Sequence, residues 1–284
     1  KVVLVLDGYD EVKPEYVSGF ISVLNDIGKR FADMTIIISS RSNFFACHPL
    51  PYELFRLADI TEQERIAYVE ERDINPVSFF NQVRERRLED ICRNVFYFVE
   101  LVRLWQIHNS LPDEADIMEA IVESRIRSDW EKYELSIPEL SEHTALLRRL
   151  FERIAFIMQC THRQQLTAIE MLKICTHDEC EQLRLHGLWE DDASGNWAFA
   201  HNNFREYFTA CWLKRQPWEQ IVSYISWSPE KLKVKPSWMT VLAYMAKMKD
   251  SRDLQDWIAL NDPAIITLFE RERFSEEERF TIFK

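Results

Sequence analysis

Two runs of consecutive apolar residues near the start of the chain predict a small parallel sheet. Residues 2–6 are all valine or leucine, and three isoleucines stand together within residues 35–40; such runs are typical of strands buried on both faces. Between them, apolar residues recur at helical spacing from Tyr16 to Phe31. A strand, a helix and a strand in this order indicate a βαβ unit with parallel pairing. Residues 55–57 are a candidate third strand.

After residue 60 the apolar positions follow a helical period. Thr61 and Glu64 have the spacing of a capping box, which opens the first of these helices. The Asn-Pro sequence at 75–76 begins the next helix, since asparagine caps helices and proline is favoured in their first turn. Further helices are predicted over residues 77–87, 88–109 and 114–134.

The segment 144–213 begins with three predicted helices. The first is amphipathic, with apolar residues at helical spacing from 147 to 158. Capping boxes at residues 167–170 and 176–179 open the other two. The third helix is expected to end at Gly187, as a C′ residue.

A hairpin and a fourth helix complete this segment. Apolar residues flank the turn 192–196, which is a β-hairpin pattern. Asn203 and Glu206 are expected to cap the last helix. Three helices, a hairpin and a helix resemble a winged helix. Residues 215–284 are again helical, without a clear repeat.

The predicted fold is therefore the α/β remnant of a parallel sheet followed by a mostly helical region. Only five glycines are present, and 46% of the 284 residues are hydrophobic, which fits a mostly helical protein with sizeable cores. The predicted domains are an α/β part (1–60), a helical part (61–140), a winged helix (141–214) and a C-terminal helical region (215–284).

Charge and composition narrow the possible partners. The net charge of −12 argues against non-specific binding of the whole chain to nucleic acid or to an anionic membrane. No apolar run reaches 18 residues, so no transmembrane helix is expected. Six scattered cysteines fit reduced thiols and a cytoplasmic location better than a disulfide framework.

Three carboxylates follow the first predicted strand: Asp7, Asp10 and Glu11. The carboxyl ends of parallel strands form the rim at which α/β proteins bind ligands. A Mg²⁺–nucleotide site would use one carboxylate on the metal and another on a water molecule. A plain acidic turn is the alternative. The chain contains no GxxxxGK[ST] sequence, so a phosphate-binding loop would lie upstream of Lys1, and we interpret the chain as part of a longer protein.

The order of the motifs resembles that of NACHT-type signal-transduction ATPases of the STAND class. VVLVLDGYDEV resembles their Walker B strand, and TIIISSR resembles the next strand with its sensor arginine. The segment that leads into their helical lid is similar to FRLADITEQERIAYVEE. The helix of that lid is similar to CRNVFYFVELVRLWQIHNSLPD. FAHNNFREYFTA is similar to their winged-helix signature. Together these motifs span residues 1–213.

The resemblance implies a role for each matching residue. Asp7 would hold the Mg²⁺ of a bound nucleotide, and Asp10 and Glu11 would orient or activate the attacking water, with Glu11 as the base. Arg41 would contact the γ-phosphate. His201 would contact the β-phosphate and hold the winged helix in a closed, ADP-bound state.

Some of these residues also have simpler interpretations. Arg41 could cap the sheet edge or pair with Glu11, and His201 could be a histidine at the edge of a core. Val95 stands where the family usually has a proline near the adenine.

The resemblance implies an ATP- and ADP-dependent switch with Mg²⁺, acting in signalling or defence. The intact protein would hydrolyse ATP slowly and self-oligomerise on activation, whereas this chain, without a phosphate loop, is expected to be inactive alone. Its partners would include the missing N-terminal phosphate-loop segment or an effector domain. The alternative is a non-enzymatic helical interaction module with a decayed nucleotide site.

Two other hypotheses have less support in the sequence. A zinc site would draw on cysteines and histidines between residues 160 and 186, but their spacing matches no CxxC pattern. DNA binding by the winged helix would use residues 176–186, where three acidic side chains outnumber the single arginine, Arg184.

Overall fold

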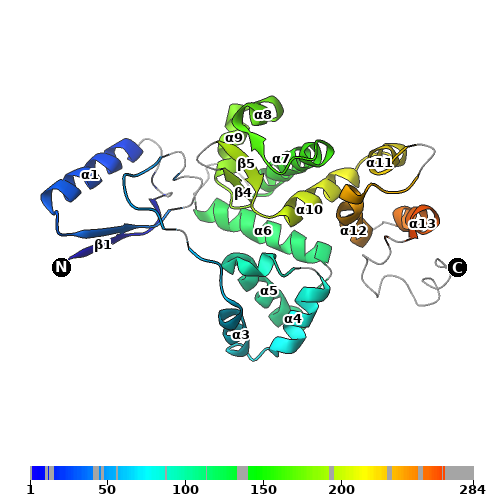
Figure 1. Ribbon diagram of the computed structural model, residues 1–284, viewed down its shortest axis with the longest axis horizontal. Helices are drawn as coiled ribbons and strands as arrows, with labels where there is room; N and C mark the ends of the chain where they lie inside the picture. The colour runs from blue at the N-terminus through cyan, green and yellow to red at the C-terminus, as the bar shows by residue number, and fades with distance from the viewer. Residues whose placement is uncertain are drawn as a thin grey trace. The chain divides into compact units, whose positions relative to one another are not determined.

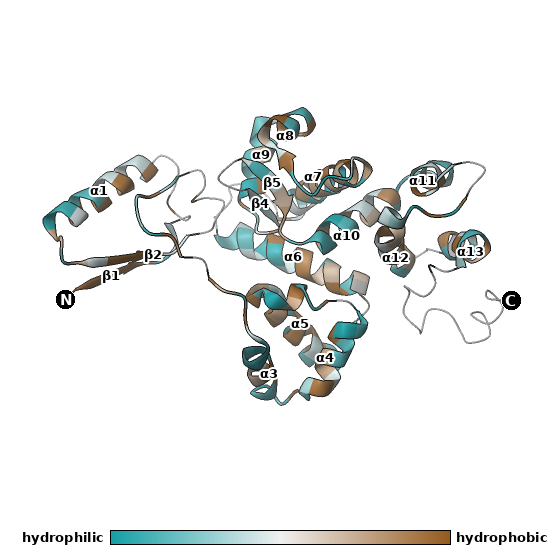
Figure 2. Ribbon diagram, viewed as in Figure 1, coloured by the Kyte–Doolittle hydropathy of each residue, from teal (hydrophilic) through white to brown (hydrophobic). Residues whose placement is uncertain are grey.

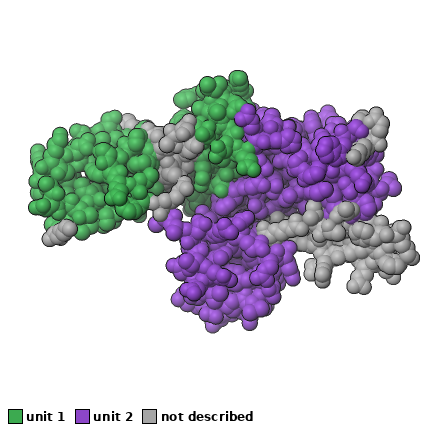
Figure 3. All heavy atoms as spheres, in the orientation of Figure 1, with its two compact units in different colours: residues 1–56, 125–143, 164–200 green, residues 57–124, 144–163, 201–284 purple. Residues whose placement is uncertain are grey.

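The chain forms a mostly helical structure with one parallel and one antiparallel sheet in its described part (Figure 1). This computed structural model describes residues 2–9, 12, 16–40, 45, 48–55, 57–86, 88–112, 114–132, 140–191, 195–228, 232–248, 252–263 and 265. Two compact units are coloured in Figure 3: unit 1 is residues 1–56, 125–143 and 164–200, and unit 2 is residues 57–124, 144–163 and 201–284. The division into four domains stays a prediction.

The parallel sheet of unit 1 confirms the predicted βαβ unit. Strands β1 (Val3–Leu6) and β2 (Thr35–Ile38) pair in parallel, and helix α1 (Val17–Arg30) connects them. The register pairs Val3 with Thr35 and Leu6 with Ile38, so both strands end at the same level.

Among the residues that the structure describes, only one face of this sheet is covered, so the prediction that both faces are buried was wrong. Leu6 and Ile38 pack on a core of Tyr9, Val17, Leu24 and Leu50, to which α1 contributes two side chains. Alternate strand residues point the other way, and Val3, Val5 and Ile37 are 53%, 65% and 53% exposed. Figure 2 shows that most of both strands is hydrophobic. One connecting helix can cover only one face.

The candidate third strand at residues 55–57 was also wrong. Phe55 and Leu57 are described and have no strand pairing, and they are 80% and 97% exposed. A short apolar run predicts a strand only when a neighbouring strand edge is available for it.

The antiparallel sheet of unit 1 has the order β3-β5-β4. Its strands are β3 (Leu166–Thr167), β4 (Trp189–Asp191) and β5 (Asn196–Phe199), and helices α8 (Ala168–Ile174) and α9 (His177–Arg184) lie between β3 and β4 in the chain. The predicted hairpin and both predicted capping boxes, at Thr167 and Thr176, are confirmed.

Gly187 does not end α9 as a left-handed C′ residue. The helix ends at Arg184 and is capped by Leu185, and Gly187 is not among the residues with positive φ. Instead, the Gly187 N–H donates to Asp129, and a Cβ at Gly187 would lie 1.9 Å from the Arg125 guanidinium. Close approach, rather than a helix cap, explains this glycine.

Unit 2 is helical in its described part. Its elements, two of which continue into unit 1 along the chain, are α3 (Glu62–Glu70), α4 (Pro76–Glu85), η3 (Ile91–Arg93), α5 (Val95–His108), α6 (Glu114–Lys132), α7 (Leu140–Cys160), α10 (Asn202–Leu213), α11 (Trp218–Ile225), η4 (Pro236–Trp238), α12 (Met239–Lys247) and α13 (Arg252–Asn261). The capping box at Thr61 is confirmed, and Asn75 caps α4 as predicted. The predicted helix 88–109 begins later, at Val95, because Asn94 caps a new helix there.

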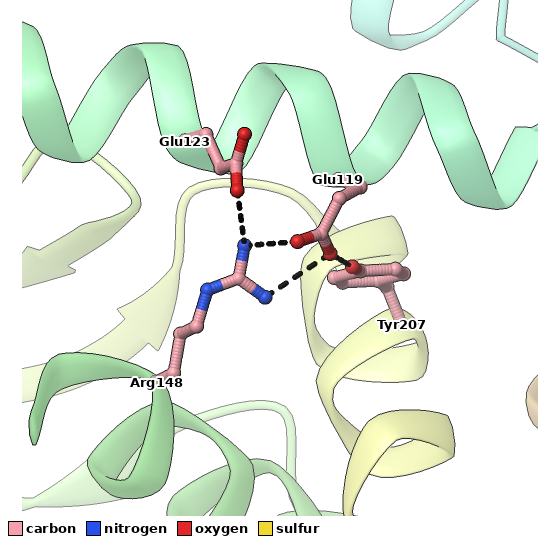
Figure 4. Close-up of polar contacts among 4 residues, drawn as sticks. All are labelled: Glu119, Glu123, Arg148 and Tyr207. Carbon is pink, nitrogen blue, oxygen red and sulfur yellow. Dashed lines mark hydrogen bonds and ion pairs between the residues drawn. The ribbon is translucent and has the colours of Figure 1, made fainter. Parts of the chain in front are cut away.

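A polar cluster joins three helices of unit 2 (Figure 4). Arg148 of α7 donates to both carboxylate oxygens of Glu119 on α6, at 2.6 and 3.0 Å. The Tyr207 hydroxyl of α10 donates to the same carboxylate. Burial raises the pKa of Tyr207, so its hydroxyl stays a donor. Arg148 and Tyr207 therefore bind the same Glu119 carboxylate, and these directional hydrogen bonds fix the separation of the three helices.

Candidate functional site at the end of the parallel strands

Asp7 lies directly after β1, at the carboxyl end of the parallel pair. Its side chain is exposed, and its Oδ1 accepts a hydrogen bond from the Ser39 hydroxyl, which follows β2. The Ser39 hydroxyl also accepts a hydrogen bond from the Gly8 N–H, at 2.8 Å. Gly8 has a φ of 76°, which only glycine adopts at little cost. The two strand ends therefore bring a carboxylate and a hydroxyl together.

Tyr9 anchors the turn that carries Asp7. It is 2% exposed, and its ring stacks on Phe20 of α1 with 5.3 Å between ring centroids. The Tyr9 N–H donates to the Ser39 carbonyl at 2.9 Å. Burial raises the pKa of Tyr9, so the phenol stays neutral. The turn after β1 is thus held from both sides, by α1 and by β2.

Three predicted site residues lie outside the described residues. These are Asp10, Glu11 and Arg41. Their roles toward water and γ-phosphate stay predictions.

A carboxylate at this strand end has the chemistry of a magnesium ligand. Mg²⁺ in nucleotide sites takes one or two protein carboxylates, with phosphates and water as its other ligands. Asp7 could supply one such carboxylate. No group of three or more histidine, cysteine, aspartate or glutamate side chains that could hold a metal occurs among the residues described.

His201 lies in unit 2, at the N-cap position of α10. The predicted capping of this helix by Asn203 and Glu206 was wrong, because the N-cap of α10 is His201, two residues earlier than expected. The His201 side chain makes no capping hydrogen bond. It packs instead against Tyr97 of α5, with ring centroids 5.3 Å apart, and against Phe204 at 6.2 Å.

The charge state of His201 follows from this packing. Burial lowers its pKa below the usual value, although the carboxylates of Asp90 and Asp59 act in the opposite direction. A neutral imidazole can donate one hydrogen bond and accept another. His201 therefore has the chemistry of a neutral hydrogen-bond donor toward an anion.

The segment that resembles the helical lid lies beside His201 within unit 2. Helix α5 begins after Asn94, whose side chain accepts from the Phe96 N–H at 3.0 Å. Tyr97, in the same first turn, contacts both His201 and Phe204. The segments around Tyr97 and His201, about one hundred residues apart in the sequence, are thus in contact within unit 2.

Sequence reasoning missed a buried network in unit 1. His143 of α7 and His186, which follows α9, face each other with 3.0 Å between their Nε2 atoms. Asp129 of α6 lies 3.5 Å from the Nδ1 atom of His186, and Arg125 pairs with that carboxylate at 3.2 Å. His186 lies 43 residues from His143 and 57 from Asp129 in the sequence, so no local pattern brings these three side chains together.

The zinc and DNA hypotheses gain nothing from the structure. Among the described residues, no group of three or more histidine, cysteine, aspartate or glutamate side chains is placed to hold a zinc ion. In α9, Arg184 pairs with Glu181 and lies over the Trp197 ring at 4.8 Å. The only arginine of that helix therefore already has partners.

Neither a protein-family model nor a curated protein matches this sequence. In the part of the chain that the structure describes, no helix is both long and apolar enough to cross a membrane.

Proposed function

We propose that this chain is part of a nucleotide-dependent molecular switch of the NACHT type, in which ADP holds a closed state and ATP an open one. The proposal combines the order of the sequence motifs with the chemistry of two described sites. A nucleotide that contacts the two states differently shifts the balance between them.

The observation that carries the proposal is the Asp7 carboxylate at the end of a parallel strand pair. It is exposed, hydrogen-bonded to Ser39 and held on a turn that Tyr9 anchors. An exposed carboxylate needs no internal partner for its own stability, because water would satisfy it. A fixed carboxylate at this edge of a sheet is what a Mg²⁺–nucleotide complex requires.

A second support is the position of His201 beside α5. Its ring is packed against Tyr97, and burial keeps it neutral. A rigid, neutral imidazole can donate a hydrogen bond to a phosphate without a charged group having to be desolvated. In this proposal Asp7 would hold the Mg²⁺, which would supply charge neutralisation at the phosphates. His201 would donate a hydrogen bond to a phosphate, as the sequence resemblance implies.

The test is ADP and ATP binding, measured by calorimetry with Mg²⁺ present. It compares this chain with a longer protein that includes the preceding segment of the same gene. We expect the longer protein to bind ADP and this chain alone to bind neither nucleotide. In the longer protein, Asp7→Ala should weaken Mg²⁺-dependent binding, and His201→Ala should weaken ADP binding.

Matched controls separate these effects from general damage. Asp26→Ala changes an exposed carboxylate of α1, and His108→Ala changes an exposed histidine at the end of α5. Both should bind as the unaltered protein does. If the longer protein binds neither nucleotide, the switch proposal fails and a non-enzymatic interaction module explains the chain better.

A further inference from the structure

Ser39 uses every polar group it has on the last residue of β1 and the three residues that follow it. Its N–H donates to the Leu6 carbonyl at 3.0 Å, and its carbonyl accepts from the Tyr9 N–H at 2.9 Å. Its hydroxyl oxygen accepts from the Gly8 N–H at 2.8 Å and donates to Asp7. The two backbone bonds extend the pairing of the strands, whereas the hydroxyl makes a separate connection to the turn.

The direction of the hydroxyl bonds follows from proton counting. A serine hydroxyl has one proton and two lone pairs. Because the Gly8 N–H can only donate, it occupies a lone pair of the Ser39 oxygen. The hydroxyl proton is then directed to the Asp7 carboxylate, in a hydrogen bond strengthened by the negative charge.

This bond restricts a side chain that would otherwise rotate freely. An exposed aspartate samples several staggered rotamers, and fixing one of them costs conformational entropy. Ser39 holds Oδ1 of Asp7, and the structure gives Oδ2 no hydrogen-bond donor among the described residues. The serine therefore orients the carboxylate while one of its oxygens stays available.

We propose that Ser39 is a positioning residue, which orients the Asp7 carboxylate for a divalent cation. This inference rests on the proposed function for its biological meaning, but the orientation can be tested without nucleotide. Gly8 contributes to the same arrangement, because the turn with its positive φ directs the Gly8 N–H toward the Ser39 hydroxyl. A residue with a side chain at Gly8 would strain this turn.

The test uses Mn²⁺ as the probe and the chain as it stands. Mn²⁺ is titrated into isotope-labelled protein, and paramagnetic broadening of the Asp7 and Gly8 amide signals reports binding at the carboxylate. We expect Ser39→Ala to weaken this binding about three- to tenfold, which is the range expected for one lost hydrogen bond. Ser39→Thr keeps the hydroxyl and should restore it.

Hydrogen exchange separates positioning from general loss of structure. In Ser39→Ala the Gly8 amide should exchange faster, because its acceptor is gone. The Thr35 amide, which donates to the Val2 carbonyl, should keep its protection if the sheet is intact. Ser18→Ala, at an exposed position of α1, is the matched control and should change neither signal. Asp7→Asn should abolish the Mn²⁺ effect at these amides.

The outcomes distinguish this inference from the proposed function. Equal Mn²⁺ binding in Ser39→Ala and the unaltered chain, with faster exchange at Gly8, would overturn the positioning role and leave Ser39 a structural residue. No Mn²⁺ effect at Asp7 in the unaltered chain would overturn it as well. If Ser39-dependent Mn²⁺ binding is found and the longer protein still binds no nucleotide, the inference stands and the proposed switch fails.

Discussion

Mild acid should destabilise unit 1 through the buried histidine pair. His143 and His186 are both 0% exposed, and their Nε2 atoms are 3.0 Å apart. The Asp129 carboxylate lies on the far side of His186 and is already paired with Arg125. A proton added to His143 therefore faces another imidazole instead of a carboxylate. In the described part of the chain the Nδ1 atom of His143 has no hydrogen-bond partner.

The size of the effect follows from the shift in proton affinity. Burial, followed by the neighbouring His186, lowers the pKa of His143 from 6.5 to about 4. The unfolded state then binds more protons than the folded state between these pH values, so stability falls as the pH falls. The contribution is complete above pH 6.5 and lost at pH 4, for a total of roughly 3 kcal/mol. By pH 5 the loss is about 2 kcal/mol.

The assay is urea unfolding between pH 7.5 and 4.5, followed by tryptophan fluorescence. His143→Gln removes the titrating group, so its loss of unfolding free energy between pH 7 and pH 5 should be about 2 kcal/mol smaller than in the unaltered protein. The comparison is between pH dependences, which cancels a constant cost of the substitution. His177→Gln, at an exposed position of α9 in the same unit, should follow the unaltered protein.

Two results would refute this reasoning. The first is an unchanged pH dependence in His143→Gln, which would mean that His143 takes up no proton on unfolding. The second is an equal reduction in both histidine variants, which would assign the effect to histidine charging in general.

Three further predictions concern stability, each measured by urea unfolding followed by circular dichroism. Tyr207→Phe removes the hydroxyl bound to Glu119 and should lower the free energy of unfolding by about 1–3 kcal/mol. An unchanged stability would mean that this hydrogen bond does not stabilise the fold. Phe208→Ala empties a fully buried position and should cost roughly 3–5 kcal/mol, so a loss below 1 kcal/mol would contradict the packing. Thr176→Ala removes the cap of α9 and should cost about 1 kcal/mol, whereas Thr176→Ser should cost less because it keeps the hydroxyl.

Local chemistry determined most element positions in advance. The capping boxes at Thr61, Thr167 and Thr176 all form where the sequence places them, because a side chain and a backbone N–H three residues away decide them. The parallel pairing of β1 with β2 was likewise predictable from a strand, a helix and a strand in succession. The Asp7 carboxylate could be placed at the strand end for the same reason.

Tertiary contacts decided what local patterns left open. The sequence could not show that α1 covers only one face of the sheet, since apolar strands look the same whether one face or both are packed. Nor could it assign the start of α10, where His201 takes the N-cap position and Asn203 reaches Tyr244 instead.

The two side-chain arrangements with the most chemical content also depended on the tertiary structure. Ser39 meets Asp7 across 32 residues, and His143 meets His186 across 43. The sequence by itself determined which polar groups exist and which helices and strands carry them. Which groups meet was decided only when distant elements packed, because a hydrogen bond depends on distances of about 3 Å that no local pattern encodes.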